Sequence, residues 1–173
     1  FYKKENEIQT HNWADIFQVV ENAVESLVLY RKNEGETLLK DISDRITLID
    51  EFLKEIVPLS EFRIENIKST LKDKIENSEL QIDPNRFEQE LIYYLEKQDI
   101  TEEIVRLQSH LNYFLETTKT NSPNGKKLGF ICQEIGREIN TIGSKASNAE
   151  MQKIVVNMKN ELEKIKEQLL NIL

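Results

Sequence analysis

The side chains of this sequence that could do chemistry gather in two short stretches, residues 100–110 and 133–145. The first stretch, ITEEIVRLQSH, spaces Glu103, Arg106 and His110 by three and four residues. On a helix this spacing places the three side chains along one stripe. A carboxylate, a guanidinium and an imidazole in such a row can bind a metal ion or neutralise a phosphate.

The second stretch, QEIGREINTIGSK, contains two glutamates and an arginine close together. Glu134 and Glu138 are four residues apart, with Arg137 between them on the same side of a helix. A short loop separates this helix from the first, so we expect antiparallel neighbours whose polar stripes meet. Further polar residues continue past the expected helix end, namely Asn140, Thr141, Ser144 and Lys145.

Together the two stripes would offer three carboxylates and one imidazole to a single site. Such a set suits Mn²⁺, Mg²⁺ or Zn²⁺, and its oxygen-rich composition favours Mn²⁺ or Mg²⁺. The sequence therefore predicts a divalent-metal site with the ligands Glu103, His110, Glu134 and Glu138. An ion held there could bind a phosphodiester oxygen and activate a water molecule.

Cationic side chains beside this site predict contacts with phosphate. Arg106, Arg137 or Lys145 would neutralise charge on a phosphodiester, and Lys126 and Lys127 would attract it from the neighbouring loop. We also expect the segment Gly-Ser-Lys to form a turn that offers backbone N–H groups to a phosphate.

The spacing leaves a simpler interpretation open. Glu–Arg pairs three or four residues apart form ordinary intrahelical salt bridges, each worth roughly 0.2–0.5 kcal/mol. His110 would then be a partly buried histidine with a hydrogen bond. No zinc-protease helix and no phosphate-binding P-loop motif occurs in the sequence. A non-catalytic helical module, with the Glu/Arg stripe as a salt-bridge network, therefore remains the alternative to an enzyme.

The composition predicts a helical protein with few tight turns. The 173 residues include only five glycines and three prolines, and 31% of them are charged. A net charge of −8 argues against a nucleic-acid partner, but its distribution is uneven. Residues 119–153 carry six basic and three acidic side chains, so the second polar stretch lies in a locally basic region.

Two further observations concern compartment and membrane. Cys132 is the single cysteine, which excludes an intrachain disulfide and fits a reducing compartment. Its apolar neighbours Ile131 and Ile135 predict a buried, unreactive thiol. No run of about 18 apolar residues occurs, so we expect no membrane-spanning segment.

Hydrophobic spacing predicts an all-α fold of long antiparallel helices forming an extended bundle. The first helix begins at Trp13, is capped by Asn12 and ends before Pro58. The sequence leaves open whether this helix continues through Gly35. A shorter helix follows over residues 64–75.

The second half predicts four shorter helical segments. One begins at Asp83-Pro84 and breaks near Gln98, where Asp99 to Glu102 form a capping box. The next ends at the loop 118–125, and the one after it ends at Gly143 in the left-handed conformation. A second capping box, Ser147 to Glu150, starts the last helix. Its coiled-coil-like seam consists of Val155, Met158, Leu162, Ile165, Leu169 and Ile172.

Three blocks of the sequence resemble the YicC/YloC-like bacterial endoribonuclease family. They are DITEEIVRLQSHLNYF (99–114), GKKLGFICQEIGREINTIGSKASNAE (125–150) and VVNMKNELEKIKEQLLNI (155–172), in the order and spacing of that family's C-terminal domain. The segment RKNEGETLLKDI (31–42) is also similar to part of the family.

The resemblance implies a cytoplasmic, divalent-metal-dependent endoribonuclease that acts on RNA and assembles as a homo-oligomer, a hexamer. Residues 1–82 would form a long helical arm and residues 83–173 the family's C-terminal helical domain. The family's α+β domain would lie upstream and be absent here. We expect Glu134, Glu138, Arg137 and His110 to be catalytic, and the RNA or phosphate contacts to be Arg106, Lys126, Lys127, Asn140, Thr141, Ser144 and Lys145.

Two glycines depart from the family's pattern. Gly129 stands where an aspartate is expected, and Gly136 where a polar residue such as asparagine is expected. The loss of a carboxylate favours a third interpretation, RNA binding without cleavage. Two helix-interior glycines also predict local softness, since each costs about 1 kcal/mol relative to alanine. The aromatic residues Phe114 and Phe130 are expected on apolar faces, so we predict no stacking platform for single strands.

Overall fold

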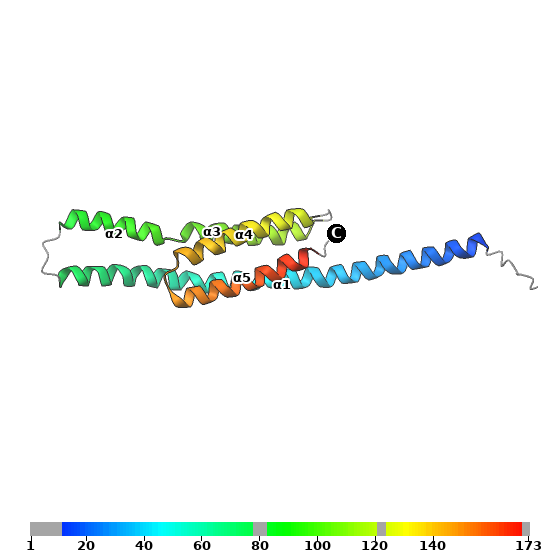
Figure 1. Ribbon diagram of the computed structural model, residues 1–173, viewed down its shortest axis with the longest axis horizontal. Helices are drawn as coiled ribbons and strands as arrows, with labels where there is room; N and C mark the ends of the chain where they lie inside the picture. Colours follow the sequence, from blue (N-terminus) through cyan, green and yellow to red (C-terminus); the bar gives the residue numbers. More distant parts are fainter. Residues whose placement is uncertain (1–11, 78–82, 121–123, 171–173) are drawn as a thin grey trace, which may run out of the picture. The chain divides into compact units, whose positions relative to one another are not determined.

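The computed structural model describes residues 12–77, 83–120 and 124–170. Five helices follow one another in these ranges (Figure 1). They are α1 (Trp13–Glu76), α2 (Pro84–Gln98), α3 (Thr101–Thr118), α4 (Gly125–Lys145) and α5 (Ala149–Leu169). No strand occurs in the described part of the chain, so the predicted all-α fold is confirmed.

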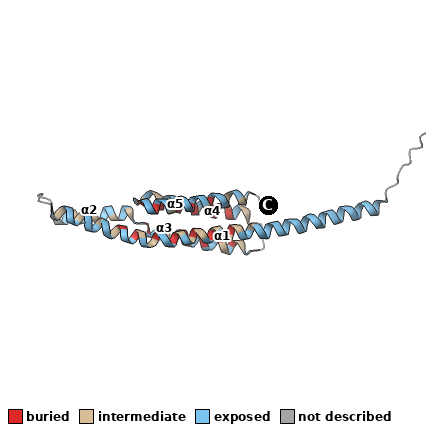
Figure 2. Cartoon of the chain, turned by 90° about the horizontal axis from the view of Figure 1, so that it is seen from below, coloured by how far each residue is buried: buried red, intermediate tan, exposed pale blue. Residues whose placement is uncertain are grey.

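The chain divides into two compact units, Phe1–Leu38 and Leu39–Leu173. In the described residues of the first unit, α1 is exposed on all sides up to residue 37 (Figure 2). The second unit contains the rest of α1 together with α2 to α5. The compact units therefore do not divide at the predicted boundary between residues 82 and 83.

The core of the second unit is formed by apolar stripes on four helices. In α1 the buried stripe steps by four and three residues, because this spacing keeps side chains on one face of a helix. Helix α4 packs against both α3 and α5, and buried residues line these contacts (Figure 2). Of the predicted seam, Leu169 is half-buried and Ile172 lies outside the described residues, whereas Val155, Met158, Leu162 and Ile165 are buried. The buried stripe of α1 consists of Ile42, Ile46, Ile49, Leu53 and Ile56.

Polar contacts fix α1 against its neighbours. Arg45 of α1 donates to Asp41 on its own helix and, over 2.8 Å, from Nη1 to Oε2 of Glu161 on α5. Gln108 of α3 donates from Nε2 to Oδ1 of Asp50 over 2.6 Å. These bonds set the rotation of α1 so that its apolar stripe faces the core.

Helix α1 continues through Pro58, so the prediction that it ends there is wrong. Proline has no N–H to donate and normally breaks a helix interior. Here the flanking turns are held by tertiary contacts, since Leu53, Ile56 and Ser60 are buried on both sides of the proline. The separate helix predicted for residues 64–75 is thus the last part of α1.

The helix starts partly follow the prediction. Asp83 caps α2 by accepting from the N–H of Asn85 at 3.0 Å, with Pro84 in the first turn, as expected. The break near Gln98 is also confirmed, because α2 ends there. However, Asp99 does not form a capping box with Glu102.

The start of α3 is instead held by hydrogen bonds between Asp99 and Thr101. Oδ1 of Asp99 accepts from the backbone N–H of Thr101 at 3.1 Å and from its hydroxyl at 2.6 Å. These hydrogen bonds favour the carboxylate, and the one from the threonine hydroxyl is the largest cause of the lowered pKa of Asp99. The start of α5 also differs, because Asn148 rather than Ser147 accepts from the first backbone N–H groups.

Gly143 does not end α4, contrary to prediction. The helix continues to Lys145, and Gly143 has no positive φ. A Cβ atom at Gly143 would lie 3.0 Å from Cγ1 of Val155, and one at Gly136 would lie 3.2 Å from Cδ2 of Leu162. The two glycines therefore allow α5 to approach α4 closely, rather than providing a turn.

Candidate functional site

Helices α3 and α4 pack side by side in opposite directions, as predicted. Lys145, at the end of α4, bonds from Nζ to Oε1 of Glu103, near the start of α3, at 2.7 Å. Toward the other end, Nζ of Lys127 lies 4.8 Å from the ring centroid of Tyr113. The two polar stripes therefore lie on adjacent helices.

The middle of the two helices contains the predicted catalytic residues. Arg106 and His110 lie between Glu103 and Tyr113 on α3, opposite the part of α4 that carries Glu134 and Glu138. Because the helices are antiparallel, these residues lie at the same level of the helix pair. His110 is half-buried, and Glu138 is buried with 5% of its surface exposed.

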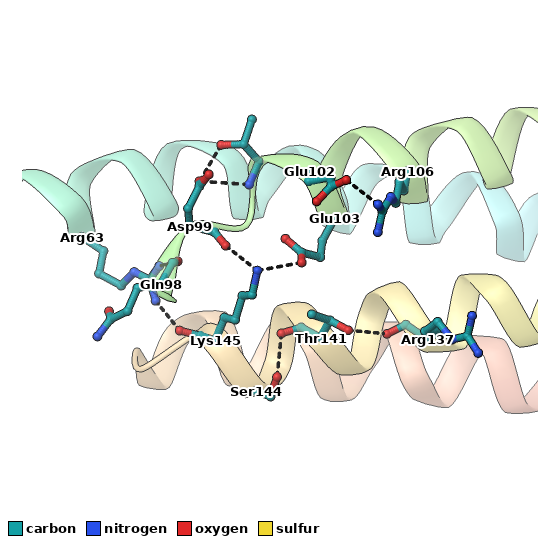
Figure 3. A network of polar contacts seen from close by, with 11 residues as sticks. Arg63, Gln98, Asp99, Glu102, Glu103, Arg106, Arg137, Thr141, Ser144 and Lys145 are labelled. Carbon is teal, nitrogen blue, oxygen red and sulfur yellow. Dashed lines mark hydrogen bonds and ion pairs between the residues drawn. The ribbon is translucent and has the colours of Figure 1, made fainter. Parts of the chain in front are cut away.

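The ammonium group of Lys145 bonds to other residues of the chain (Figure 3). Its Nζ donates to Oε1 of Glu103 and, at 2.9 Å, to the backbone oxygen of Asp99. The Glu103 side chain is only 7% exposed, and its second oxygen, Oε2, is buried without a hydrogen-bond partner. Lys145 thus supplies the charge that makes burial of the Glu103 carboxylate tolerable.

Arg63 of α1 belongs to the same network, because it bonds to the backbone of Lys145. Its Nη1 donates to the backbone oxygen of Lys145 at 2.8 Å, and its Nη2 to that of Gln98 at 2.6 Å (Figure 3). The last turns of α2 and α4 end here, and their carbonyl groups lack partners within the helices. The guanidinium therefore caps two helices at once and fixes the α2–α3 connection against α4.

The two exposed arginines of the site are paired with carboxylates of their own helices. Arg106 bonds to Glu102, and Arg137 bonds from Nη1 to Oε2 of Glu134 at 3.2 Å. All four side chains are more than 40% exposed. Such pairs contribute little stability, so a phosphate could displace the carboxylates at small cost.

The polar residues after Arg137 lie along the continuing helix. The hydroxyl of Thr141 donates to the backbone oxygen of Arg137, and that of Ser144 to the backbone oxygen of Thr141. Asn140 is exposed. Because Gly143 to Lys145 are helical, the predicted turn with backbone N–H groups for a phosphate does not form.

The four predicted metal ligands do not form one site within the chain. Glu103 and His110 are seven residues apart on α3, a rise of about 10 Å. Ligand oxygens lie only about 2.1 Å from Mg²⁺. Among the residues that the structure describes, no group of three or more His, Cys, Asp or Glu side chains is placed to hold a metal ion. Glu103 instead bonds to Lys145.

Cys132 takes no part in this surface. Its side chain is fully buried in α4, and burial raises the pKa of the thiol to about 12. A thiol in this state is not a nucleophile at neutral pH, so the expectation of an unreactive buried cysteine is confirmed.

Aromatic side chains at the basic end of the site differ from the prediction. Phe130 was expected on an apolar face, but it is 67% exposed, and Tyr113 is exposed beside Lys127. Phe114 is fully buried, as expected. The exposed cation Lys127 therefore has an aromatic neighbour, Tyr113, that the helical spacing alone did not reveal.

The most informative residue that the prediction missed is Arg63. It occupies a position of the α1 stripe that steps from Leu53 to Ile56 and Ser60, and it is 6% exposed. An arginine at a core position of an amphipathic helix is the signal that could have identified it, because a buried guanidinium needs partners.

The described helices include none long and apolar enough to cross a membrane. Comparison with known proteins identifies a family. The family model described as "Endoribonuclease YicC-like, C-terminal" matches residues 56–173. This range contains the last part of α1 and all of α2 to α5.

Two curated proteins extend the similarity. The chain is 41% identical over 165 residues to the probable endoribonuclease YicC of Clostridioides difficile (strain 630), covering 92% of this chain and 56% of that protein. It is 30% identical over 158 residues to the probable endoribonuclease YicC of Haemophilus influenzae, covering 91% of this chain and 55% of that protein. The chain spans about half the length of the curated relatives it matches. By the match of the family model to most of its length, this chain belongs to the YicC-like endoribonuclease family.

Proposed function

We propose that this chain is the helical part of an endoribonuclease that acts on RNA along the α3–α4 surface. The observation that carries the proposal is the family match, which covers both helices and every predicted site residue. Two relatives whose names read probable endoribonuclease support the same reaction.

In this proposal the exposed cations bind the RNA backbone. Arg106 and Arg137 exchange their carboxylate partners for phosphate, with which a guanidinium forms two parallel hydrogen bonds. Lys126 and Lys127 attract the strand at the other end of α4. Asn140 adds a hydrogen bond, and the hydroxyl oxygens of Thr141 and Ser144 can still accept from a ribose 2′-hydroxyl, since their protons are used within the helix.

The proton-transfer groups would be His110, Glu134 and Glu138. An imidazole and carboxylates at the same level of the helix pair can take a proton from the attacking hydroxyl group and return one to the leaving oxygen. Arg137 would stabilise the charge that develops on the phosphorus oxygens. Lys145, with Glu103, acts as a positioning residue that holds the end of α4 against the start of α3.

Dependence on Mn²⁺ or Mg²⁺ remains part of the proposal. Because the predicted ligands do not form a set within one chain, we derive no step through the ion. The cytoplasmic location and assembly as a homo-oligomer, a hexamer in the family, are likewise proposed from the resemblance.

A specific observation also favours the non-catalytic alternative. The Glu/Arg stripe does form ion pairs, Arg106 with Glu102 and Arg137 with Glu134, as a structural module would require. In that case the chain would bind RNA, or other copies of itself, without cleaving a phosphodiester.

The test is cleavage of an end-labelled structured RNA by the chain, and by a form extended upstream to the length of its relatives. Each is assayed with Mn²⁺, with Mg²⁺ and with a chelator. We expect internal cleavage that the chelator stops, and RNA binding that weakens steeply as salt rises. Salt-dependent binding without cleavage under any condition would support the alternative and contradict the enzymatic proposal.

A further inference from the structure

A large cleft lies between the last part of α1 and helix α2, apart from the α3–α4 surface. Its volume is about 720 Å³, within the range of small-molecule sites. Aromatic and aliphatic side chains form most of its walls, and Arg63 and Gln98 line it as well. Neither the family match nor the proposed cleavage chemistry assigns a role to this cleft.

Arg63 places a buried positive charge at the wall of the cleft. It is 6% exposed and makes no ion pair with a carboxylate in the part of the chain that the structure describes, since its two bonds go to backbone oxygens. Burial lowers the pKa of its guanidinium. Buried charges are normally paired, so this position favours an anionic group beside it.

Two polar atoms of the same region lack hydrogen-bond partners. Nε of Arg63 is a donor and Oε1 of Gln98 is an acceptor, and both are buried. The two residues are neighbours, because Nη2 of Arg63 donates to the backbone oxygen of Gln98 (Figure 3). A donor and an acceptor on neighbouring residues can pair with the edge of a nucleobase, which also presents both. Gln98 is the last residue of α2 and only half-buried, so its side chain can turn to admit such an edge.

Exposed aromatic rings supply the remaining recognition element. Phe62, Tyr93 and Tyr94 line the cleft, and each is at least 46% exposed. Nζ of Lys97 lies 4.2 Å from the ring centroid of Tyr93. Aromatic side chains bind unpaired bases by stacking, and a neighbouring ammonium group binds the phosphate.

We propose that this cleft binds one unpaired nucleotide of an RNA, with the base stacked on Tyr93 or Tyr94 and a phosphate near Lys97 and Arg63. The inference rests on the proposed function and gives it a second contact with the substrate. Two cations and one acid, Glu90, line the cleft, so its charge suits an anionic ligand, and its exposed aromatic rings favour a nucleotide over an acidic peptide.

The experiment measures binding of a 5′-fluorescent hexauridylate by anisotropy, using the whole 173-residue chain. Tyr93→Leu and Tyr94→Leu are combined in one variant, because both rings are exposed and their loss should not unfold the chain. Tyr30→Leu is the matched control, since Tyr30 is 64% exposed in the first unit and far in sequence from the cleft. We expect the double variant to bind about tenfold more weakly and the control to match the wild type.

A crosslinking measurement locates the base independently. Hexauridylate containing 4-thiouridine should crosslink to a peptide containing residues 87–98. In a separate measurement, Lys97→Gln should reduce the salt dependence of binding, because it removes a phosphate contact. Unchanged affinity in the double variant, with crosslinks only to α3 or α4, would overturn the cleft while leaving the proposed function intact. If the wild-type chain binds no RNA at all, the cleft and the proposed function are both wrong.

Discussion

At the scale of single residues, Lys145 illustrates how a residue expected to bind substrate has a structural role. Its ammonium group bonds to Glu103 and to the backbone oxygen of Asp99, and its own carbonyl accepts from Arg63. The three bonds join α1, the α2–α3 connection and the end of α4 (Figure 3). Removing the ammonium group would leave a buried carboxylate without a donor.

We therefore predict that Lys145→Met lowers the free energy of unfolding by about 2 kcal/mol. Lys126→Met is the matched control, because Lys126 is an exposed lysine of the same helix, and a change within about 0.5 kcal/mol is expected. Urea denaturation followed by circular dichroism measures both. Equal stability of the two variants would show that the Glu103 contact contributes nothing.

We predict that the free energy of unfolding depends on pH through Asp99. The pKa of its carboxyl group is lowered in the folded chain, chiefly by the hydrogen bond from the Thr101 hydroxyl. A carboxyl group with a lowered folded pKa stabilises the fold above its unfolded pKa, near 3.8, and loses this contribution as the pH falls through the folded value.

Asp99→Asn keeps an oxygen that can accept from Thr101 but cannot ionise. We expect the variant to be less stable than the wild type at pH 7, with the difference shrinking as the pH falls below the unfolded pKa near 3.8 and through the lower folded pKa. Thermal unfolding at a series of pH values measures it. A difference that stays constant from pH 7 to pH 3 would mean that the charge of Asp99 is not what stabilises the start of α3.

Sequence reasoning placed the candidate side chains on their helices but did not find the partner of each. Three- and four-residue spacing placed Glu134 beside Arg137 correctly, because both lie on one helix. It could not show that Glu103 faces Lys145, since that contact depends on how two helices pack. For the same reason it treated Glu103 and His110 as joint metal ligands, although their separation along α3 argues against this.

At the scale of the elements, two glycines of α4, Gly143 and Gly129, differ in how closely a neighbouring helix approaches them. A Cβ atom at Gly143 would lie 3.0 Å from Val155, whereas nothing lies within 4 Å of a Cβ atom at Gly129. Val155 is fully buried and β-branched, so it cannot rotate away easily.

Gly143→Ala should therefore destabilise the chain by about 1–2 kcal/mol, because overpacking outweighs the helix propensity of alanine. Gly129→Ala should stabilise it by about 1 kcal/mol through propensity alone. Chemical denaturation of the two variants is the measurement. If both substitutions stabilise the chain, the close approach of α4 and α5 does not require Gly143.

The helices themselves were largely predictable, and their ends were less so. Hydrophobic spacing identified the buried stripes of α1, α4 and α5, since burial of these side chains decides which segments are helical. Local signals misplaced the ends at Pro58 and Gly143. In both cases packing against neighbouring helices overrides the preference of a proline or glycine, and a single sequence does not show that packing.

At the scale of the whole molecule, the described part of the first unit has an apolar stripe that no other described residue covers. Trp13, Phe17, Val20, Val24 and Leu27 follow one another by four and three residues, and each is more than half exposed. This heptad-like spacing is typical of a helix that associates with another helix. It supports the proposed homo-oligomer.

We predict that replacing Val20 and Val24 with lysine reduces the oligomeric state of the chain, because charge would enter the seam. Asn22→Lys adds a charge on the opposite face of α1 and should leave the mass unchanged. Light scattering after size-exclusion chromatography gives the masses. An unchanged mass in the double variant would exclude this stripe as the contact between copies.

We propose that the α3–α4 surface cleaves RNA, and a comparison of three proteins can test this. Single-turnover cleavage of an end-labelled RNA is measured for the upstream-extended protein, for Glu134→Gln and for Glu163→Gln. Glu163 is the control, because it is an exposed glutamate of α5 paired with Lys166, as Glu134 is paired with Arg137. We predict a rate at least about 100-fold lower for Glu134→Gln and an unchanged rate for Glu163→Gln. Equal rates for all three proteins would contradict the account, because the chemistry would then lie outside this surface.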